Sequence, residues 1–549
     1  MSIAKKVVVS VFIIVLFSAG IFYFDKYLST GADVAYYLDL SAIASRGGSF
    51  LIDYIDYRIP IFSLIFSPIY KLGLLDFQNR YLMFSLIYSA YGLALYFLGF
   101  SISKSSFKSV VATLIGLMSI TSVQFDPARN ISVPLFYHTL ELAGLLIVLS
   151  FFLGKLGNAK KIYQITALLA VGLLSGFSFL GRQTQIFLPA LFVGYCIWSV
   201  YGYLIGKIIR KNILFILPFG LGFGLSALII FWAIYTPNIE FFKLAKDWLF
   251  NYPRYAYNTT FYTVVKKFII TLYMGLPELR NINLPLFWLA YVGLIAYASR
   301  LFVNLKNLED LKNYYQKNKK PLLTVATIAV MSIFTVLLTG SGARSHESSF
   351  FTLYFAILVF SLSKIGRENF KKTLTIGLLI FIFVLPNLID FGKKEVRQYL
   401  SYKNQYNPDK FTHQIAEEIK KIADKNDTVL VLGGHPTVSR LVEYKLFMGL
   451  PADTISFYAV PKILGTEYFD KVKSEFKKIK IIYKLPDYPN LRILSGVKED
   501  KSNEVYQFVE NSIKTEFKEY SVVIDPSVEA GNLNSYGHPK DRAIIYMRK

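Results

Sequence analysis

The sequence predicts an all-α polytopic membrane protein with about 11 transmembrane helices, followed by a C-terminal, outward-facing α/β soluble domain. Three observations predict this class. The 549 residues are 54% hydrophobic with a mean hydropathy of +0.41. Only 18% are charged, compared with roughly a quarter in soluble proteins. Apolar windows recur through the first 390 residues, and basic residues gather between alternate windows.

Each window holds the roughly 20 apolar residues that a helix needs to cross about 30 Å of hydrocarbon. The predicted spans are 7–24, 81–100, 107–124, 134–154, 162–180, 184–206, 212–235, 284–303, 321–339, 347–364 and 372–390. The break between the spans on either side of Arg182 is very short.

The distribution of charge predicts the orientation of these spans. With a cytoplasmic N-terminus, the cytoplasmic segments carry 20 basic and 3 acidic residues, whereas the outer side of the first 390 residues carries 14 basic and 13 acidic ones. Such an excess of Lys and Arg marks the cytoplasmic side. Most of the net charge of +23 is therefore an orientation signal, and nucleic-acid binding is not needed to explain it. The sequence predicts a multi-pass protein of the cell membrane.

The odd number of spans places residues 391–549 outside the cytoplasm. This segment contains no window long enough to cross a bilayer. Residues 409–425 have the apolar spacing of an amphipathic helix, and the run at 428–434 is typical of a buried strand. We therefore predict two domains, a transmembrane domain at 1–390 and an extracytoplasmic α/β domain at 391–549. The single cysteine, Cys196, excludes an intrachain disulfide.

The first outer loop, residues 25–80, carries the most informative pattern. Asp33 precedes a helical pattern that Gly47 and Gly48 end, with apolar residues on one face and Asp39 on the other. This pattern predicts an amphipathic helix on the membrane surface. Asp33 is equally well explained as the N-cap of that helix.

This loop resembles the first outer loop of GT-C glycosyltransferases, closest to the protein mannosyltransferase and aminoarabinose transferase branch. The resemblance lies in the order of a Gly-x-Asp, a short helix, a Gly-Gly pair and an Asp-x-x-Asp-x-Arg-x-Pro element. The matching residues are Asp33, Asp53, Asp56, Arg58 and Pro60. Val34 stands where Glu is common, and Arg58-Ile59-Pro60 replaces Lys-Pro-Pro.

Three further segments resemble the same family. Residues 176–191 resemble its helix with a cation at the outer end, here Arg182. Residues 340–357 resemble its late outer loop, with Arg344 and His346 ahead of an aromatic-rich helix. A strand of the form at 427–434, in an outward α/β domain after the last helix, is also common in the branch. The resemblance in layout covers the whole chain.

The resemblance implies an inverting glycosyltransferase that takes a sugar from a polyprenyl-phosphate carrier, dolichyl or undecaprenyl, at the outer face of the membrane. It implies Asp33 as the base for the acceptor hydroxyl, with Asp56 and Asp53 as alternatives. Cations must stabilise the leaving phosphate. The candidates for that role are Arg58, Arg182, Arg344 and His346.

Other interpretations of these residues stay open. Each Arg is as well explained by a side chain that reaches the lipid headgroups, although Arg182 interrupts an apolar stretch. His138 and Glu141 share one helix face near the outer surface, which indicates either a cavity lining or a mutual hydrogen bond. Carboxylates could hold Mg²⁺ or Mn²⁺, as in some relatives, and nothing in the sequence requires a cofactor.

The expected partners are a polyprenyl-phosphate-linked sugar, membrane lipids and an acceptor that is a lipid, a protein or a glycan. Two other classes compete with this reading. An O-antigen-type polymerase or ligase also uses outer Arg and His residues, but usually lacks a 159-residue outer domain at the C-terminus. A transporter or flippase for lipid-linked glycans would show paired repeats and charges near the midplane. Apart from Glu141 and the break at Gly181, the sequence shows neither.

Overall fold

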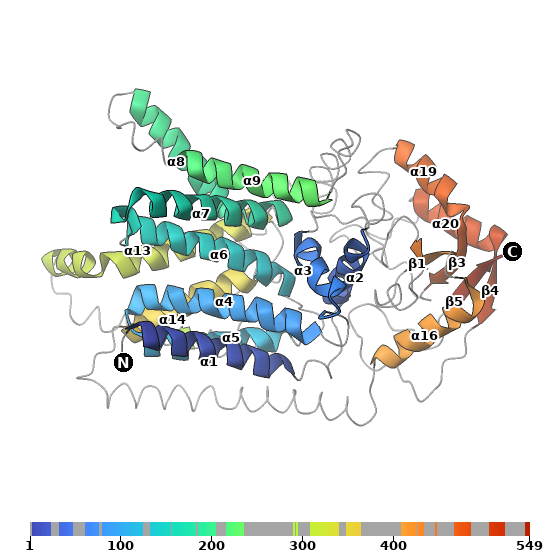
Figure 1. Ribbon diagram of the computed structural model, residues 1–549, viewed down its shortest axis with the longest axis horizontal. Coiled ribbons are helices and arrows are strands. Elements are labelled where there is room, and N and C mark those ends of the chain that lie inside the picture. The colour runs from blue at the N-terminus through green and yellow to red at the C-terminus, as the bar shows by residue number, and fades with distance from the viewer. Residues whose placement is uncertain are drawn as a thin grey trace. The chain divides into compact units, whose positions relative to one another are not determined.

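The computed structural model of the chain is mostly helical (Figure 1). It describes residues 3–23, 32–47, 61–75, 80–124, 132–154, 156–182, 185–204, 216–234, 289–290, 293–294, 308–339, 347–363, 408–424, 427–432, 445–446, 466–484, 504–521 and 544–549. Two compact units divide the chain. One holds the long apolar helices, and the other holds two short helices of the first loop together with the C-terminal elements.

The long helices of the first unit cover most of the predicted spans. They are α1 (Ile3–Tyr23), α4 (Arg80–Ser103), α5 (Ser106–Gln124), α6 (Ser132–Phe152), α7 (Lys161–Gly181), α8 (Phe187–Leu204), α9 (Ile216–Ile234), α13 (Leu308–Thr339) and α14 (Glu347–Ser363). Among the described residues, three helices are long and apolar enough to cross a membrane: Tyr81–Ser103, Ser132–Phe152 and Lys161–Gly181. These three confirm the predicted spans 81–100, 134–154 and 162–180. The total of eleven spans stays a prediction, because 372–390 and nearly all of 284–303 lie outside the described residues.

Short turns hold neighbouring helices of this unit together. Between α4 and α5, Lys104 has a φ of 55°, a conformation that residues with a Cβ rarely adopt. The amide of Lys104 donates to the carbonyl of Phe100, and the amide of Ser109 donates to Ser105. The side chain of Ser105 accepts from the amide of Lys108, which is the usual N-cap bond of a helix. In Figure 1, α4, α5, α6 and α7 run alongside one another.

Helices α7 and α9 approach each other through glycines. A Cβ added at Gly172 would lie 2.2 Å from the carbonyl oxygen of Phe219 on α9. A Cβ at Gly222 of α9 would lie 2.2 Å from the carbonyl oxygen of Leu169 on α7. Both obstacles are backbone atoms, which cannot rotate away. Glycine is therefore required at these positions for the two backbones to come this close, as is common between membrane helices.

Helix α13 is longer than the apolar segment that predicted it. The predicted span began at residue 321, whereas the helix begins at Leu308 and runs for 32 residues. Glu309 and Asp310 lie in its first turn, where carboxylates stabilise the helix N-terminus. Pro321 lies inside the helix, between the polar first part and the apolar second part.

In the second unit, the first-loop helices are α2 (Ala32–Ser45) and α3 (Ile61–Lys71). The predicted helix from Asp33 to the glycine pair is confirmed, and Gly47 beyond its end has a φ of +83°. Tyr37, Leu38 and Leu40 of α2 are buried; the side chain of Asp39 lies outside the described residues, so its predicted place on an opposite polar face stays a prediction. Helix α3 packs against α2, and the rings of Tyr37 and Phe62 lie 5.4 Å apart.

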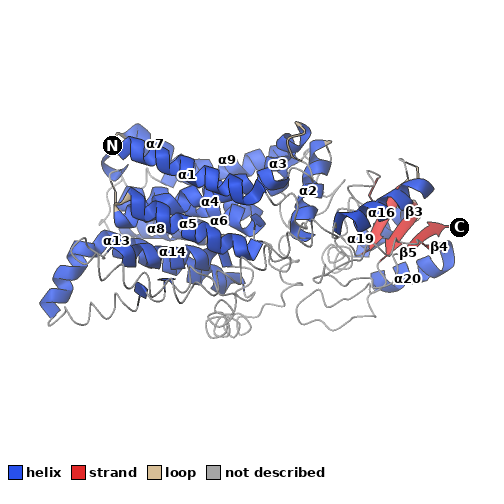
Figure 2. Ribbon diagram, turned by 90° about the horizontal axis from the view of Figure 1, so that it is seen from below, coloured by secondary structure: helices blue, strands red, loops and turns tan. Residues whose placement is uncertain are grey.

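The C-terminal elements of this unit form a five-stranded mixed sheet with helices beside it (Figure 2). The strands are β1 (Thr428–Leu432), β2 (Lys445–Leu446), β3 (Ile479–Lys484), β4 (Phe517–Ser521) and β5 (Ile544–Arg548), in the order β2-β1-β3-β5-β4. Strand β1 is parallel to β2 and β3, and β5 is antiparallel to β3 and β4. The helices are α16 (Pro408–Ile422), α19 (Thr466–Phe476) and α20 (Glu504–Glu516).

The strand predicted at 428–434 and the helix predicted at 409–425 are confirmed by β1 and α16. Ile415, Ala416 and Ile419 of α16 are buried on one face, as its apolar spacing predicted. The outward position of this sheet and a domain boundary at residue 390 stay predictions.

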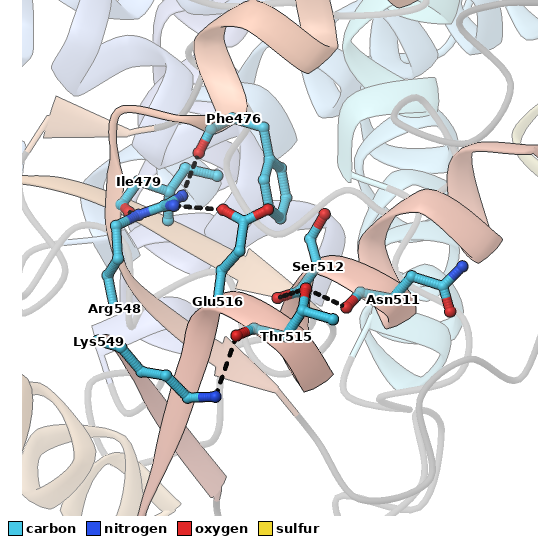
Figure 3. Close-up of polar contacts among 8 residues, drawn as sticks. All are labelled: Phe476, Ile479, Asn511, Ser512, Thr515, Glu516, Arg548 and Lys549. Atoms are coloured by element: carbon cyan, nitrogen blue, oxygen red, sulfur yellow. Dashed lines mark hydrogen bonds and ion pairs between the residues drawn. The ribbon is translucent and has the colours of Figure 1, made fainter.

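Arg548 joins the last strand to a neighbouring strand and to two helices (Figure 3). Nε of Arg548 donates to the carbonyl of Ile479 at 2.6 Å, and Nη2 donates to the carbonyl of Phe476 at 2.7 Å. Nη1 pairs with the carboxylate of Glu516 at the end of α20. The guanidinium also lies 4.6 Å from the centre of the Phe517 ring. Arg548 therefore fixes the end of β5 against α19, β3 and α20.

Candidate functional site

His138 and Glu141 lie in the first half of α6, about one turn apart, and both are 0% exposed. Nε2 of His138 lies 2.8 Å from Oγ1 of Thr352 on α14. The hydroxyl of Tyr91 on α4 lies 2.9 Å from the same Oγ1. A chain of three polar side chains thus joins α4, α14 and α6 inside the bundle. Polar groups buried in this way need such partners, because an unpaired one is expensive in an apolar interior.

Glu141 bonds a different element. Its Oε1 accepts the backbone N–H of Phe187 at 3.1 Å, and Phe187 is the first residue of α8. The first amides of a helix have no partner within the helix, and its N-terminus carries partial positive charge. A carboxyl oxygen at this position accepts from one of these amides and lies where the partial positive charge of the helix end favours it. The spacing of His138 and Glu141 allowed a mutual hydrogen bond, but His138 bonds to Thr352 and Glu141 bonds to the Phe187 amide instead.

Arg182 and Gln185 lie in the short turn between α7 and α8, and both are buried, at 5% and 2% exposure. The amide of Arg182 donates to Ser178 at 2.9 Å, and the amide of Gln185 donates to the carbonyl of Arg182 at 2.9 Å. We call residues 178–187 the Arg182 turn. Because Arg182 is covered by protein, it does not project to the lipid headgroups as a surface arginine would.

Helix α6 also contacts the start of the Arg182 turn. The hydroxyl of Ser178 donates to the carbonyl of Tyr137 at 2.8 Å. A Cβ at Gly181 would lie 2.1 Å from a ring carbon of Tyr137, so the two surfaces are in direct contact. Further along, the side chains of Gln185 and Arg182 lie near that of His138. We call the following residues the buried polar cluster: Tyr91, His138, Glu141, Arg182, Gln185 and Thr352.

This cluster combines the guanidinium of Arg182, an imidazole and an amide with the carboxyl group of Glu141, which accepts from the N-terminus of α8. Guanidinium groups favour anions, and phosphate is the anion that arginine pairs with most specifically. A buried guanidinium interacts more strongly with such a group than an exposed one does, because water screens it less. Arg182 is therefore the member of the cluster whose chemistry suits an anion.

The other predicted site residues have different outcomes. Asp33 is the second residue of α2, within the first turn of that helix. Asp53, Asp56, Arg58, Arg344 and His346 lie outside the described residues. The roles assigned to all of them, and the cavity lining proposed for His138 and Glu141, stay predictions.

Sequence reasoning did not find Tyr91 and Thr352, which complete the buried polar cluster. No local pattern marks them, because Thr352 lies 214 residues from His138 in the chain. Gln185 had a signal, since polar side chains follow Arg182 within an apolar stretch.

Among the residues that the structure describes, no group of three or more His, Cys, Asp or Glu side chains could hold a metal ion. Asp53 and Asp56, the candidate carboxylates of the first loop, are not among the described residues. A site for Mg²⁺ or Mn²⁺ stays a prediction.

The apolar helices and their buried polar cluster define an integral membrane protein. No family model matches the chain, and no curated protein matches it. The chain is similar to solved structures of an oligosaccharyltransferase from Archaeoglobus fulgidus. One, in complex with zinc and sulfate, has a TM-score of 0.45 and 12% identity, covering 86% of this chain and 67% of that one. Another, AglB with an inhibitory peptide and a dolichol-phosphate, has a TM-score of 0.47 and 12% identity, covering 88% and 70%. At these values the likeness is too weak to assign an activity.

Proposed function

We propose that the protein is a membrane glycosyltransferase of GT-C type that transfers a sugar from a polyprenyl-phosphate carrier to an acceptor at the outer face of the membrane. The observation that carries this proposal is the burial of Arg182 within a polar cluster at the end of α7, an end that we predict to face outside. Water screens a buried guanidinium little, so it interacts strongly with an anion that reaches it. A lipid phosphate at the outer surface is a ligand of matching charge and position.

The reaction follows from the residue types of the proposed site. The carboxylate of Asp33 accepts the proton of the acceptor hydroxyl as its oxygen attacks the anomeric carbon. The bond from this carbon to the phosphate oxygen breaks on the opposite face, so the configuration inverts. Negative charge then grows on the leaving lipid phosphate, and Arg182 stabilises it together with Arg58, Arg344 and His346.

In this proposal the N-terminus is cytoplasmic and the C-terminal sheet is extracytoplasmic, on the same side as the carboxylates and cations. The acceptor is a lipid, a protein or a glycan of the cell envelope. The sugar belongs to the hexoses or pentoses that such carriers bear.

The experiment compares surface glycans by mass spectrometry in cells that contain the protein and in cells from which it has been deleted. We expect a specific glycan to disappear on deletion and to return with the wild-type chain. Asp33→Asn should not restore it, although the variant should insert and accumulate normally, because an amide cannot accept the proton. Asp39→Asn, on the same helix, is the matched control and should restore the glycan.

Two results would count against the proposal in different ways. Unchanged glycans after deletion would remove the glycosyltransferase function itself. Full restoration by Asp33→Asn would remove only the base role from Asp33 and would transfer it to Asp56.

A further inference from the structure

The second half of the Arg182 turn is attached to α6 by a single carboxylate. Glu141 Oε1 accepts the Phe187 amide at 3.1 Å, and the amide of Leu188 also interacts with this carboxylate. We propose that Glu141 is a positioning residue for Arg182: by holding the N-terminus of α8 it fixes the turn that carries the guanidinium. This inference rests on the proposed function, in which Arg182 binds the lipid phosphate.

The geometry supports this role because α6 holds both ends of the same turn. At the start, Ser178 donates to the Tyr137 carbonyl, and Gly181 lies against the Tyr137 ring. At the end, Glu141 holds Phe187. Arg182 lies between these two attachments, so it has little freedom to move relative to α6. Removing one attachment frees half of the turn.

A further contact of α8 with α6 is apolar and does not fix the position of the first residues of α8 along the helix axis. A Cβ at Gly144 would meet the side chain of Leu188 at 2.7 Å, which shows close packing one turn below Glu141. Apolar packing is non-directional. The hydrogen bond from Phe187 to Glu141 supplies the direction that packing lacks.

The chemistry of a carboxylate at a helix N-terminus explains why a glutamate lies in this buried position. A polar side chain buried in the membrane interior needs hydrogen-bond partners. The amides at the start of α8, which have no acceptor within their own helix, supply donors for the carboxyl oxygens. The length of the side chain matters as well, because the carboxyl must reach from α6 to α8.

Geometry and charge can be separated by two conservative variants. Glu141→Gln keeps the length and one oxygen acceptor but removes the charge. Glu141→Asp keeps the charge but is one methylene shorter, so its oxygens fall short of the Phe187 amide. If Glu141 acts by position, the glutamine variant retains more function than the aspartate variant. If it acts through its charge on the phosphate or on Arg182, the order reverses.

The experiment uses the full-length protein in lipid nanodiscs, with undecaprenyl monophosphate as the probe. Affinity for this lipid is measured by native mass spectrometry, and amide hydrogen exchange is measured over residues 182–190. Thr139→Ala is the matched control, since Thr139 lies on α6 and its hydroxyl bonds only the carbonyl of Leu135 on the same helix.

We expect Glu141→Ala to weaken lipid binding about tenfold, which corresponds to the loss of one buried hydrogen bond. Exchange of the Phe187 and Leu188 amides should become faster in the same variant. Glu141→Gln should bind the lipid more tightly than Glu141→Asp, and Thr139→Ala should match the wild type in both measurements.

Three results would overturn the inference. Unchanged lipid affinity in Glu141→Ala, with a wild type that binds, would remove Glu141 from the site while leaving the proposed function intact. An affinity order with aspartate above glutamine would show that charge, rather than position, is what Glu141 contributes. A wild type that does not bind the lipid phosphate would overturn the proposed function, and the inference with it. If the alanine variant does not fold, the glutamine and aspartate pair still decides the question.

Discussion

Alanine at Gly172 tests whether the close approach of α7 and α9 sets the position of Arg182. The new Cβ would lie 2.2 Å from the carbonyl oxygen of Phe219 and 2.9 Å from the amide nitrogen of Phe223. Ordinary contacts of a Cβ begin near 3.4 Å. The two helices must therefore move apart by about 1 Å, since neither obstacle can rotate away.

We expect this overpacking to cost about 1–3 kcal/mol. That corresponds to a fall in Tm of about 2–6 °C, measured by intrinsic fluorescence on the full-length protein in nanodiscs. Lipid-phosphate affinity should fall too, because α7 ends at Arg182. The matched control is Gly224→Ala on α9, where a Cβ would meet nothing within 4 Å. Gly224→Ala should be neutral or slightly stabilising, since alanine favours a helix more than glycine does. Equal Tm values for the two variants would refute the reasoning.

The C-terminal sheet supplies two further predictions. Burial opposes ionisation of Asp427, but the amide of Asp424 at 2.7 Å and Lys480 Nζ at 2.9 Å outweigh it and lower the pKa of Asp427. The ionised Asp427 carboxylate therefore stabilises the folded state. This stabilisation is present above the ordinary carboxyl pKa of about 3.9 and is lost as the pH falls through the lowered pKa of Asp427. Asp427→Asn should remove this acid dependence from the exchange of β1 amides, corrected for intrinsic rates, and an unchanged pH profile would contradict it. Arg548→Lys should lose the bonds to two backbone carbonyls that a single ammonium cannot replace together. It should destabilise β5 by about 1–3 kcal/mol, seen as faster amide exchange at Ile544–Arg548, and exchange at the wild-type rate would contradict it.

Hydropathy located the membrane helices well, because burial in lipid and burial in protein both select apolar residues. The span predicted at 134–154 is α6, Ser132–Phe152, and the span at 162–180 is α7, Lys161–Gly181. The same method missed the first part of α13, which is polar. That part is helical through its own backbone bonds and its acidic first turn, and hydropathy does not register either.

The buried polar cluster was only half predictable. Helical spacing brought His138 and Glu141 to one face, and the break in the apolar run marked Arg182. The bonds themselves go to Thr352 and to the Phe187 amide. Such partners depend on how separate helices pack, and periodicity within one helix does not report that. In α2, likewise, the sequence predicted a helix with an apolar face, but not that Leu38 and Leu40 would be buried within the protein.

The proline inside α13 leaves one backbone carbonyl of the helix in need of another hydrogen-bond donor. A helix of 32 residues is about 48 Å long, whereas the hydrocarbon is only about 30 Å thick. Pro321 has no amide hydrogen, so the carbonyl of Lys317 lacks its donor four residues along the helix. In hydrocarbon that carbonyl would need another donor from the protein, whereas at the headgroups a water molecule can take the place of the amide. In the predicted topology Pro321 therefore lies at the level of the headgroups, with the lysine-rich first turns of α13 in the aqueous phase.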